Sequence, residues 1–253
     1  MKPLRTNAGG GLNRIARGAA LLMAAILLTA CGASKPVDDP RPLTANEAEL
    51  LASTRLVLGQ QGTVPVHMDW PGTPATTIDA VLDLKTGYAY GTATTPASAG
   101  MPEMKHAIAW STQRLATAPW TAGQKAAPDV SQWEMRSITT SNGLDLFLAI
   151  ALSLGADRPD NPLLVRQSTA RYLRADKVDG VAVSVMSGPQ EAGQTGESRT
   201  RYWIDAEGNL KEFQANLNLP NKALASITMV KSVNLPKDLS SVAAQVVIVQ
   251  SVN

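Results

Sequence analysis

The spacing of apolar residues near the start of the chain's main body is that of an amphipathic helix. Apolar residues recur at helical intervals over residues 45–58, with Leu51 in the middle of the stripe. Thr44 and Glu47 form a capping-box pattern, in which the hydroxyl accepts the Glu47 N–H and the carboxylate accepts the Thr44 N–H. Gly59 follows the last apolar position. The sequence therefore predicts a helix over residues 45–58.

After this helix the apolar positions alternate with a period of two, which predicts strands with one buried face. The turn sequences 85–87 and Asp179-Gly180 predict hairpins, because Gly residues supply the positive φ that tight turns need. Gly91 lies inside a predicted strand, which indicates a bulge or a close backbone approach. The predicted strands are 78–84, 88–93, 106–111, 113–117, 170–176, 181–187, 199–205, 210–219, 227–233 and 246–250.

A second helical stretch interrupts the strands and differs from the first in being apolar nearly all round. It covers residues 144–154 (LDLFLAIALSL), with Asn142 as a predicted N-cap and Gly155 after its end. A helix of this kind is buried or covered by something apolar. Two interpretations stay open, namely that its side chains line a lipid cavity or that they seal a closed core. The candidate ligand-binding side chains are Leu146, Phe147, Ile150 and Leu154.

Short connections between the predicted strands favour an antiparallel meander over parallel βαβ units. The expected architecture is a single α+β domain over residues 44–253. A curved antiparallel sheet would carry the N-terminal helix and the inserted apolar helix on its concave face. A length of about 220 residues suits one domain of the larger sandwich or barrel kind, or two small ones.

The first 30 residues have the three parts of a secretory signal. Four basic residues precede an apolar run over residues 19–28, and small residues follow it. The run is shorter than the ~20 residues of a spanning helix. The tetrapeptide Leu28-Thr29-Ala30-Cys31 resembles the lipobox of bacterial lipoproteins, in which the cysteine is diacylated and becomes the N-terminus. This resemblance predicts a signal peptide over residues 1–30 and lipidation of Cys31. The alternatives are an ordinary secretory signal with a chance cysteine, or an uncleaved anchor.

The segment after the cysteine predicts a flexible tether over residues 31–43, since it is small, polar and proline-bearing. Lipidation would place the domain on the extracytoplasmic face of the cell membrane. Gly32 shows no aspartate-type signal for retention in an inner membrane, and the type of envelope stays open. With Cys31 as its one cysteine, the chain can form no intramolecular disulfide.

Removal of the signal reverses the sign of the net charge. Residues 1–30 hold four of the 23 Lys and Arg residues and none of the 21 Asp and Glu residues. The rest therefore carries 19 basic and 21 acidic residues, a net charge of −2. This domain has no basic footprint for nucleic acid, so we expect no nucleic-acid partner.

A later segment, Tyr202-Trp203-Ile204-Asp205-Ala206-Glu207-Gly208-Asn209-Leu210, follows a hairpin at Val178-Asp179-Gly180-Val181. This order of elements resembles lipid-carrying half-barrel lipoproteins, the group of the LolA and LolB carriers and the LppX/LprG lipoproteins of actinobacteria. The resemblance implies helices that plug a curved sheet around acyl chains. It implies no enzymatic activity and transfers no catalytic residue. The long region 119–142 and the low number of Phe residues depart from the group's pattern.

The sequence offers little for catalysis or for cofactors. His67 and Asp69 would share a strand face, but no Gly-x-Ser-x-Gly elbow accompanies them, so a hydrolase is the weakest of the candidate classes. No metal-binding motif accompanies the two histidines, His67 and His106. We therefore expect a non-enzymatic, cofactor-free lipoprotein that binds a lipid or another lipophilic molecule. The alternative is an envelope module with a closed core that binds another envelope protein through loops such as 188–197.

Overall fold

A computed structural model describes residues 37–248 of the chain except residues 99, 101, 122 and 191–197. The predicted signal peptide, the lipobox with Cys31 and most of the loop 188–197 lie outside the described residues. Within the part described, no helix is both long enough and apolar enough to cross a bilayer.

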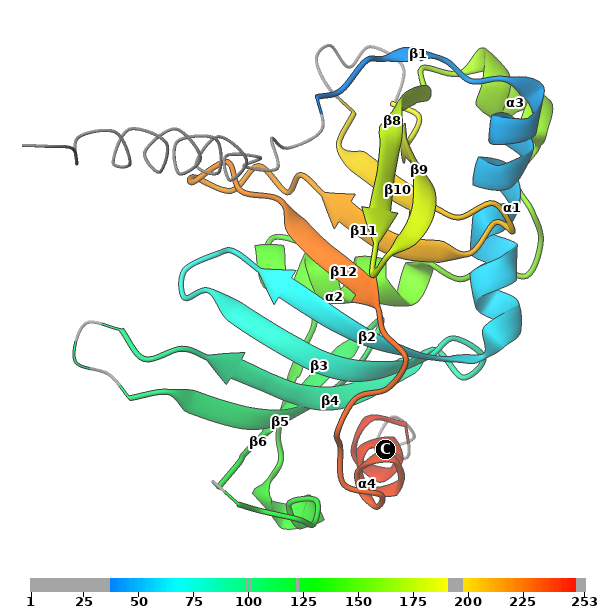
Figure 1. Cartoon of the computed structure of the whole chain (residues 1–253). Coiled ribbons are helices and arrows are strands. Elements are labelled where there is room, and N and C mark those ends of the chain that lie inside the picture. The colour runs from blue at the N-terminus through cyan, green and yellow to red at the C-terminus, as the bar shows by residue number, and fades with distance from the viewer. Residues whose placement is uncertain (1–36, 99, 101, 122, 191–197, 249–253) are drawn as a thin grey trace, which may run out of the picture. The chain divides into compact units, whose positions relative to one another are not determined.

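Twelve strands form one open sheet in which every neighbouring pair is antiparallel. The order across the sheet is β1-β8-β9-β10-β11-β12-β2-β3-β4-β5-β6-β7, and Figure 1 shows its curvature. The strands are β1 (Arg41–Pro42), β2 (Thr63–Trp70), β3 (Thr76–Asp83), β4 (Tyr88–Thr95), β5 (Met104–Ser111), β6 (Arg114–Pro119), β7 (Glu134–Ser137), β8 (Arg171–Val178), β9 (Val181–Ser187), β10 (Thr200–Ile204), β11 (Leu210–Ala215) and β12 (Ala225–Met229).

The two halves of the chain join through β12 and β2, where Ile227 lies opposite Met68. Both side chains are fully buried and face the same side of the sheet. Pairing of the last strand with the first long one continues a single core across the sheet. The predicted α+β class with a curved antiparallel sheet is confirmed by this topology.

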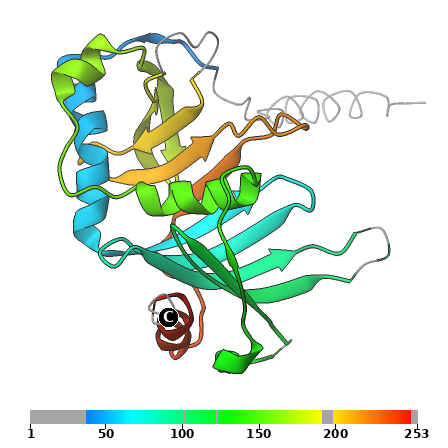
Figure 2. The same ribbon diagram turned by 180° about the vertical axis from the view of Figure 1, so that it is seen from behind.

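Helices cover both faces of the sheet (Figures 1 and 2). Helices α1 (Ala45–Gln61) and α2 (Gly143–Ser153) pack on one face, which we call the inner face, and α4 (Leu239–Val247) packs on the other, the outer face. The short helix α3 (Pro162–Gln167) lies beside α1. A single 3-10 turn, η1 (Val130–Gln132), precedes β7.

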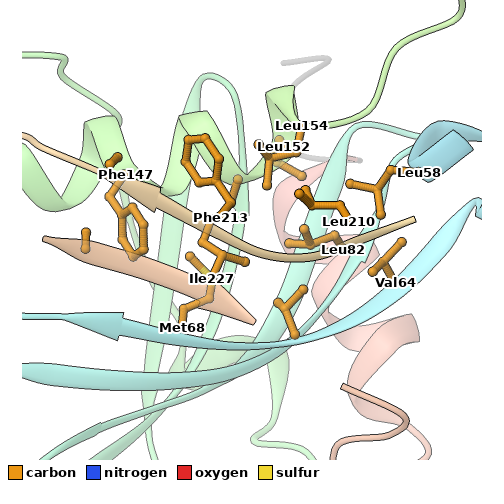
Figure 3. Packing of buried hydrophobic residues seen from close by; sticks show 14 of the residues in the cluster. Leu58, Val64, Met68, Leu82, Phe147, Leu152, Leu154, Leu210, Phe213 and Ile227 are labelled. Carbon is orange, nitrogen blue, oxygen red and sulfur yellow. The ribbon is translucent and has the colours of Figure 1, made fainter. Parts of the chain in front are cut away.

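The inner face holds the main hydrophobic core. Apolar residues from α1 and α2 and the inward positions of the strands form one contiguous cluster. Figure 3 shows side chains of this cluster between α2 and the strands. The residues labelled there are Leu58, Val64, Met68, Leu82, Phe147, Leu152, Leu154, Leu210, Phe213 and Ile227. With no disulfide available, burial of this apolar surface supplies most of the stability, at ~25 cal/mol per Å².

The predicted last strand over residues 246–250 is wrong, because Leu239–Val247 form α4. Its buried residues Leu239, Ala243, Val246 and Val247 recur at helical spacing. They pack on the outer face of β4 to β6, where β5 and β6 present small side chains that leave room for a helix. Those alanines are Ala107, Ala109, Ala116 and Ala118. The sequence around residues 246–250 is a short run of β-branched residues, and periodicity alone does not distinguish a strand from a helix in so short a run. The run also does not show that a distant part of the sheet offers a surface on which a helix can pack.

The described end of the predicted tether lies along β8. Arg41 and Pro42 pair with Tyr172 and Arg171, and the Asp39 N–H donates to the Leu173 carbonyl at 2.7 Å. The Arg41 guanidinium also donates two hydrogen bonds to the Glu47 carboxylate, at 2.7 and 2.8 Å. These bonds lower the pKa of Glu47 to about 2. The approach to α1 is therefore held against the sheet by a backbone pairing and an ion pair.

Local sequence signals are realised as expected at several points. The Thr44 hydroxyl accepts the Glu47 N–H at 3.3 Å, and the Glu47 carboxylate accepts the Thr44 N–H at 2.9 Å. Asp179 and Gly180 both have positive φ, 49° and 79°, as a type I′ hairpin requires. At Gly91 a Cβ would lie 2.1 Å from the Asp79 carbonyl oxygen, so this glycine marks a close backbone approach.

Candidate lipid-binding site

Helix α2 lies across the inner face and is the centre of the candidate site (Figure 2). The Asn142 side chain caps it by accepting the N–H groups of Leu144 and Asp145, at 3.0 and 3.2 Å. Its residues are apolar on nearly every side, so the helix gains little from water on any face. Its position on the sheet follows from burial of Phe147, Leu148, Ala151, Leu152 and Leu154.

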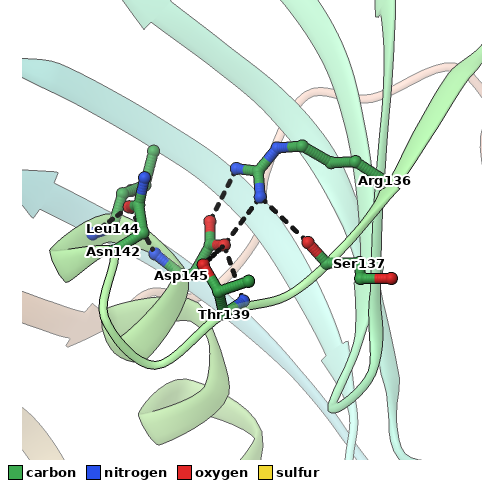
Figure 4. Close-up of polar contacts among 6 residues, drawn as sticks. All are labelled: Arg136, Ser137, Thr139, Asn142, Leu144 and Asp145. Carbon is green, nitrogen blue, oxygen red and sulfur yellow. Dashed lines mark hydrogen bonds and ion pairs between the residues drawn. The ribbon is translucent and has the colours of Figure 1, made fainter.

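An ion pair fixes the N-terminal end of α2 to the edge of the sheet. Arg136 on β7 donates two hydrogen bonds of 2.6 Å to the two carboxylate oxygens of Asp145 (Figure 4). The Thr139 N–H donates to the same carboxylate at 3.0 Å. Burial raises the pKa of Asp145, but the hydrogen bonds from Arg136 and Thr139 outweigh it and hold this pKa below its usual value. Asp145 is thus a buried, fully bonded anion.

Two tryptophans position the middle of α2. The Trp70 and Phe147 rings stack with their centroids 6.0 Å apart. The Trp110 Nε1–H donates to the Leu148 carbonyl at 3.0 Å, although that carbonyl is inside the helix. Sequence reasoning pointed to neither contact nor to the Arg136–Asp145 pair. The tryptophans stood out in the sequence, but they show no shared periodicity that could identify a partner.

The four side chains predicted to line a cavity lie on two sides of α2. Phe147 is 0% exposed and Leu154 is 3% exposed, and both belong to the main core on the sheet side. Leu146 and Ile150 are half-buried, and Ile150 packs against the margin of that core. One turn of helix separates Leu146 from Ile150, so these two share the flank that faces away from the sheet. The structure therefore brings the four together on one helix, but in two pairs.

Several half-buried apolar residues pack against the main core, and we call five of them the rim. They come from α2 and from the segments after β11 and within β12, and they are Leu144, Ile150, Leu217, Leu219 and Met229. Gly143 lies close to Trp70 and to Leu219 of the rim. A Cβ at this position would lie 2.7 Å from the Trp70 ring and 3.7 Å from the Leu219 side chain.

The space between α2 and the sheet is filled by the side chains of the main core. The largest cavity described lies on the outer face beside Asp38 and Arg171, and its volume is about 550 Å³. Two further cavities lie at α1 and α3, beside Glu49, and a small one lies between β10 and β11. None of these four is lined by the predicted ligand-binding residues.

His67 lies on the outer face, between two carboxylates. Its Nδ1 is 2.7 Å from Asp79 Oδ1, and its Nε2 is 3.5 Å from Asp69 Oδ1. A Ser-His-Asp triad needs one ring nitrogen directed at the serine and the other at the acid. Here each nitrogen faces a carboxylate, so His67 has the geometry of a surface ion pair. Among the described residues no group of three or more His, Cys, Asp or Glu side chains could hold a metal ion.

We expect the His67 ring to titrate above its ordinary value of 6.5, because the hydrogen bond to Asp79 stabilises the imidazolium. A raised pKa means that His67 contributes stability below pH 6.5 and that this contribution is lost as the pH rises through the folded-state pKa. NMR titration of the ring protons measures the midpoint. Asp79→Asn should lower it, whereas Asp129→Asn, at an exposed site on another segment, should not. Equal midpoints in the wild type and Asp79→Asn would contradict the assignment.

Comparison with known proteins gives similarity in structure alone. No family model matches the chain, and no curated protein matches it. Fifteen chains of solved structures match this chain. Three of them are described here, and each has low sequence identity to it. LprF from Mycobacterium bovis is 16% identical, over 78% of this chain and 99% of LprF, with a TM-score of 0.42. A putative outer membrane lipoprotein-sorting protein domain from Vibrio parahaemolyticus is 9% identical, over 78% and 99%, with a TM-score of 0.28.

The third structure is a LolA superfamily protein from Nitrosomonas europaea. It is 11% identical, over 78% of this chain and 97% of that protein, with a TM-score of 0.25. Similarity at this level does not identify a ligand. A proposal about function therefore has to rest on the open curved sheet and on helix α2.

Proposed function

We propose that this chain is a membrane-anchored extracytoplasmic lipoprotein whose domain binds a lipophilic molecule on the inner face of its sheet. The observation that carries the proposal is α2, an apolar helix laid on the concave side of an open sheet. Its buried side holds apolar contacts that an acyl chain could replace, and Ile150 on its outer flank leaves an apolar margin half-open. In this proposal the ligand displaces α2 from the sheet rather than entering a ready-made cavity.

Such an exchange has a favourable part, which is burial of the ligand, and an unfavourable part, which is loss of the contacts that hold α2, including the Arg136–Asp145 pair. Burial of an acyl chain contributes ~0.8 kcal/mol per CH₂ group. Displacement of α2 exposes the side chains that it buries, including Phe147 and Leu148. The two surfaces are alike in chemistry, so a long acyl chain could compensate for the lost helix contacts. No charged group of the protein is needed at the inner face, which suits a carrier that must also release its ligand.

The anchor in this proposal is the diacylated Cys31. Stable attachment to a bilayer takes more than one acyl chain, and a diacylated cysteine supplies two. The protein would then act at a membrane surface as a carrier. No enzymatic step is part of the proposal.

A second candidate function follows from the filled inner face. The main core is contiguous from α1 to α2. Two of the cavities described above reach its margin at Ala48 and Leu50 on α1, and none of the four is lined by a residue of α2. A closed core is what a non-catalytic interaction or regulatory module would have. In that case an envelope protein, rather than a lipid, would be the partner.

Native mass spectrometry of residues 32–253, exported and purified without detergent from the native host, separates the two functions. This segment contains the whole compact unit Val37–Asn253. A stoichiometric lipid adduct supports the carrier. Ile150→Asp should reduce that adduct strongly, because it places a charge on the apolar margin. Leu163→Asp, at a residue 55% exposed on α3, is the matched control and should retain it.

The opposite result is equally clear. An unliganded mass, together with no uptake of a fluorescent fatty acid by the folded wild-type domain, would contradict the carrier and favour the closed-core module. Circular dichroism of each variant shows whether its fold is kept.

A further inference from the structure

The largest described cavity is a polar pocket on the outer face, on the side of the sheet away from α2. Its floor includes Leu173, which belongs to a small outer-face cluster with Trp203 and is separate from the main core. The volume is about 550 Å³, enough for a phosphate group with its substituents. Most of the wall is polar and comes from β8, β9, β10 and the residues next to them. The polar residues of this wall include Asp38, Arg171, Ser187, Ser198 and Arg201.

Arg171 brings a guanidinium to this pocket without an acidic partner. Its Nη1 donates to the carbonyls of Ser168 and Ala170, at 3.2 and 2.8 Å, and it makes no ion pair with any residue that the structure describes. A guanidinium carries five N–H donors, so most of those of Arg171 are not used by these two bonds. Ser187 and Ser198 line the same wall, and their hydroxyls are bonded within the protein. The Ser187 hydroxyl accepts the Arg171 N–H at 3.0 Å, and the Ser198 hydroxyl donates to the Gly188 carbonyl at 2.8 Å.

The carboxylate of Asp38 already binds to arginine side chains at this wall. Asp38, just before β1, contacts Arg174 and lies 3.2 Å from Arg201 Nη2. Arg174 Nε is buried and has no hydrogen-bond partner among the described residues. Among the described residues that line the pocket, Arg171 and Arg201 are positively charged and Asp38 is negatively charged, which sums to one positive charge.

We propose that this pocket binds a phosphate-type oxyanion, with Arg171 as its principal ligand. Guanidinium groups bind phosphate through paired hydrogen bonds, and a partly enclosed site strengthens them. Two sources share this chemistry, namely free phosphate and the phosphate of a lipid headgroup. The headgroup source rests on the proposed function. Asp38 is seven residues after Cys31 and so can lie no more than ~25 Å from a lipidated cysteine.

The test uses the full chain in a nonionic detergent and follows its ¹H–¹⁵N NMR spectrum, including the arginine Nε–Hε signals. The probes are inorganic phosphate and, separately, dihexanoylphosphatidylglycerol, with sodium chloride of equal ionic strength as the control. We expect saturable shifts at Arg171, Ser198 and Arg201. Arg171→Gln should weaken phosphate binding by about tenfold. Arg166→Gln, on the neighbouring helix α3 and outside the pocket, should leave it unchanged.

Saturation by phosphate alone assigns a free oxyanion, and tighter saturation by the phosphatidylglycerol assigns a headgroup. Either outcome supports the site. Absence of saturable shifts with both probes, or equal affinity in Arg171→Gln, overturns it. The result does not depend on the inner face, so a failed lipid adduct at α2 and a failed phosphate titration here remain distinguishable.

Discussion

Replacing Phe147 with alanine is expected to lower the free energy of unfolding by about 3–5 kcal/mol. The side chain is 0% exposed, stacks on Trp70 and lies beside Phe213 and Ile227 in the core (Figure 3). Its removal takes apolar contacts from both the helix and the sheet and leaves a cavity that the strands cannot close. Urea denaturation followed by tryptophan fluorescence measures the change. Leu163→Ala, on an exposed position of α3, should stay within about 0.5 kcal/mol of the wild type.

A loss of less than about 1 kcal/mol in Phe147→Ala would contradict the packing of α2 on the sheet. The same variant also bears on function. If a ligand must displace α2, weaker packing should speed the uptake of a fluorescent fatty acid relative to the wild type. If the core stays closed, uptake should be absent in both. Stopped-flow fluorescence distinguishes these results in the folded protein.

Replacing Asp145 with asparagine is expected to cost about 2–3 kcal/mol. The change removes the charge that pairs with Arg136 and places an amide where the Thr139 N–H needs an acceptor. Loss of one member of a fully buried pair costs ~3–5 kcal/mol. Here the Arg136 side chain is 49% exposed and can regain water, so we expect the smaller value. Asp157→Asn, on an exposed loop, is the matched control and should have little effect on the urea midpoint.

The acid side of the stability profile provides a second measure of this pair. The folded-state pKa of Asp145 lies below its ordinary value of 3.8. Its contribution is therefore complete above that pH and is lost as the pH falls through the folded-state pKa. Asp145→Asn should reduce the loss of stability between about pH 4 and pH 2 relative to the wild type. Parallel acid profiles in the two proteins would mean that the carboxylate is not held in its charged form by the fold.

Elements whose signals are local could be predicted from the sequence. The capping box at Thr44 and Glu47 sets the start of α1, because both hydrogen bonds form within four residues. The hairpin at Asp179-Gly180 joins β8 to β9, because its backbone needs positive φ at two adjacent positions. The apolar run over residues 144–154 likewise predicted α2 almost to its ends. In each case the residues that decide the structure are neighbours in the chain.

Other features depended on partners that lie far away in the sequence. The last helix, α4, packs where the outer face of β5 and β6 is lined with alanines, more than 100 residues before it. Arg136 finds Asp145 only when β7 and α2 are both in place. The polar pocket at Arg171 is lined by Asp38 and Arg201, which form an ion pair although they lie more than 100 residues apart in the sequence.

The sequence by itself determined the apolar character of α2, the two-residue period of the strands and the short connections that make an antiparallel sheet. Only the tertiary structure decided that Phe147 and Leu154 are buried in the core while Leu146 and Ile150 stay half-buried, Ile150 at the margin of that core. The physical reason is that helical periodicity fixes which side chains share a flank, but not which flank the sheet receives when the whole helix is apolar. That choice comes from the shape of the inner face, where Trp70 and Trp110 position the helix.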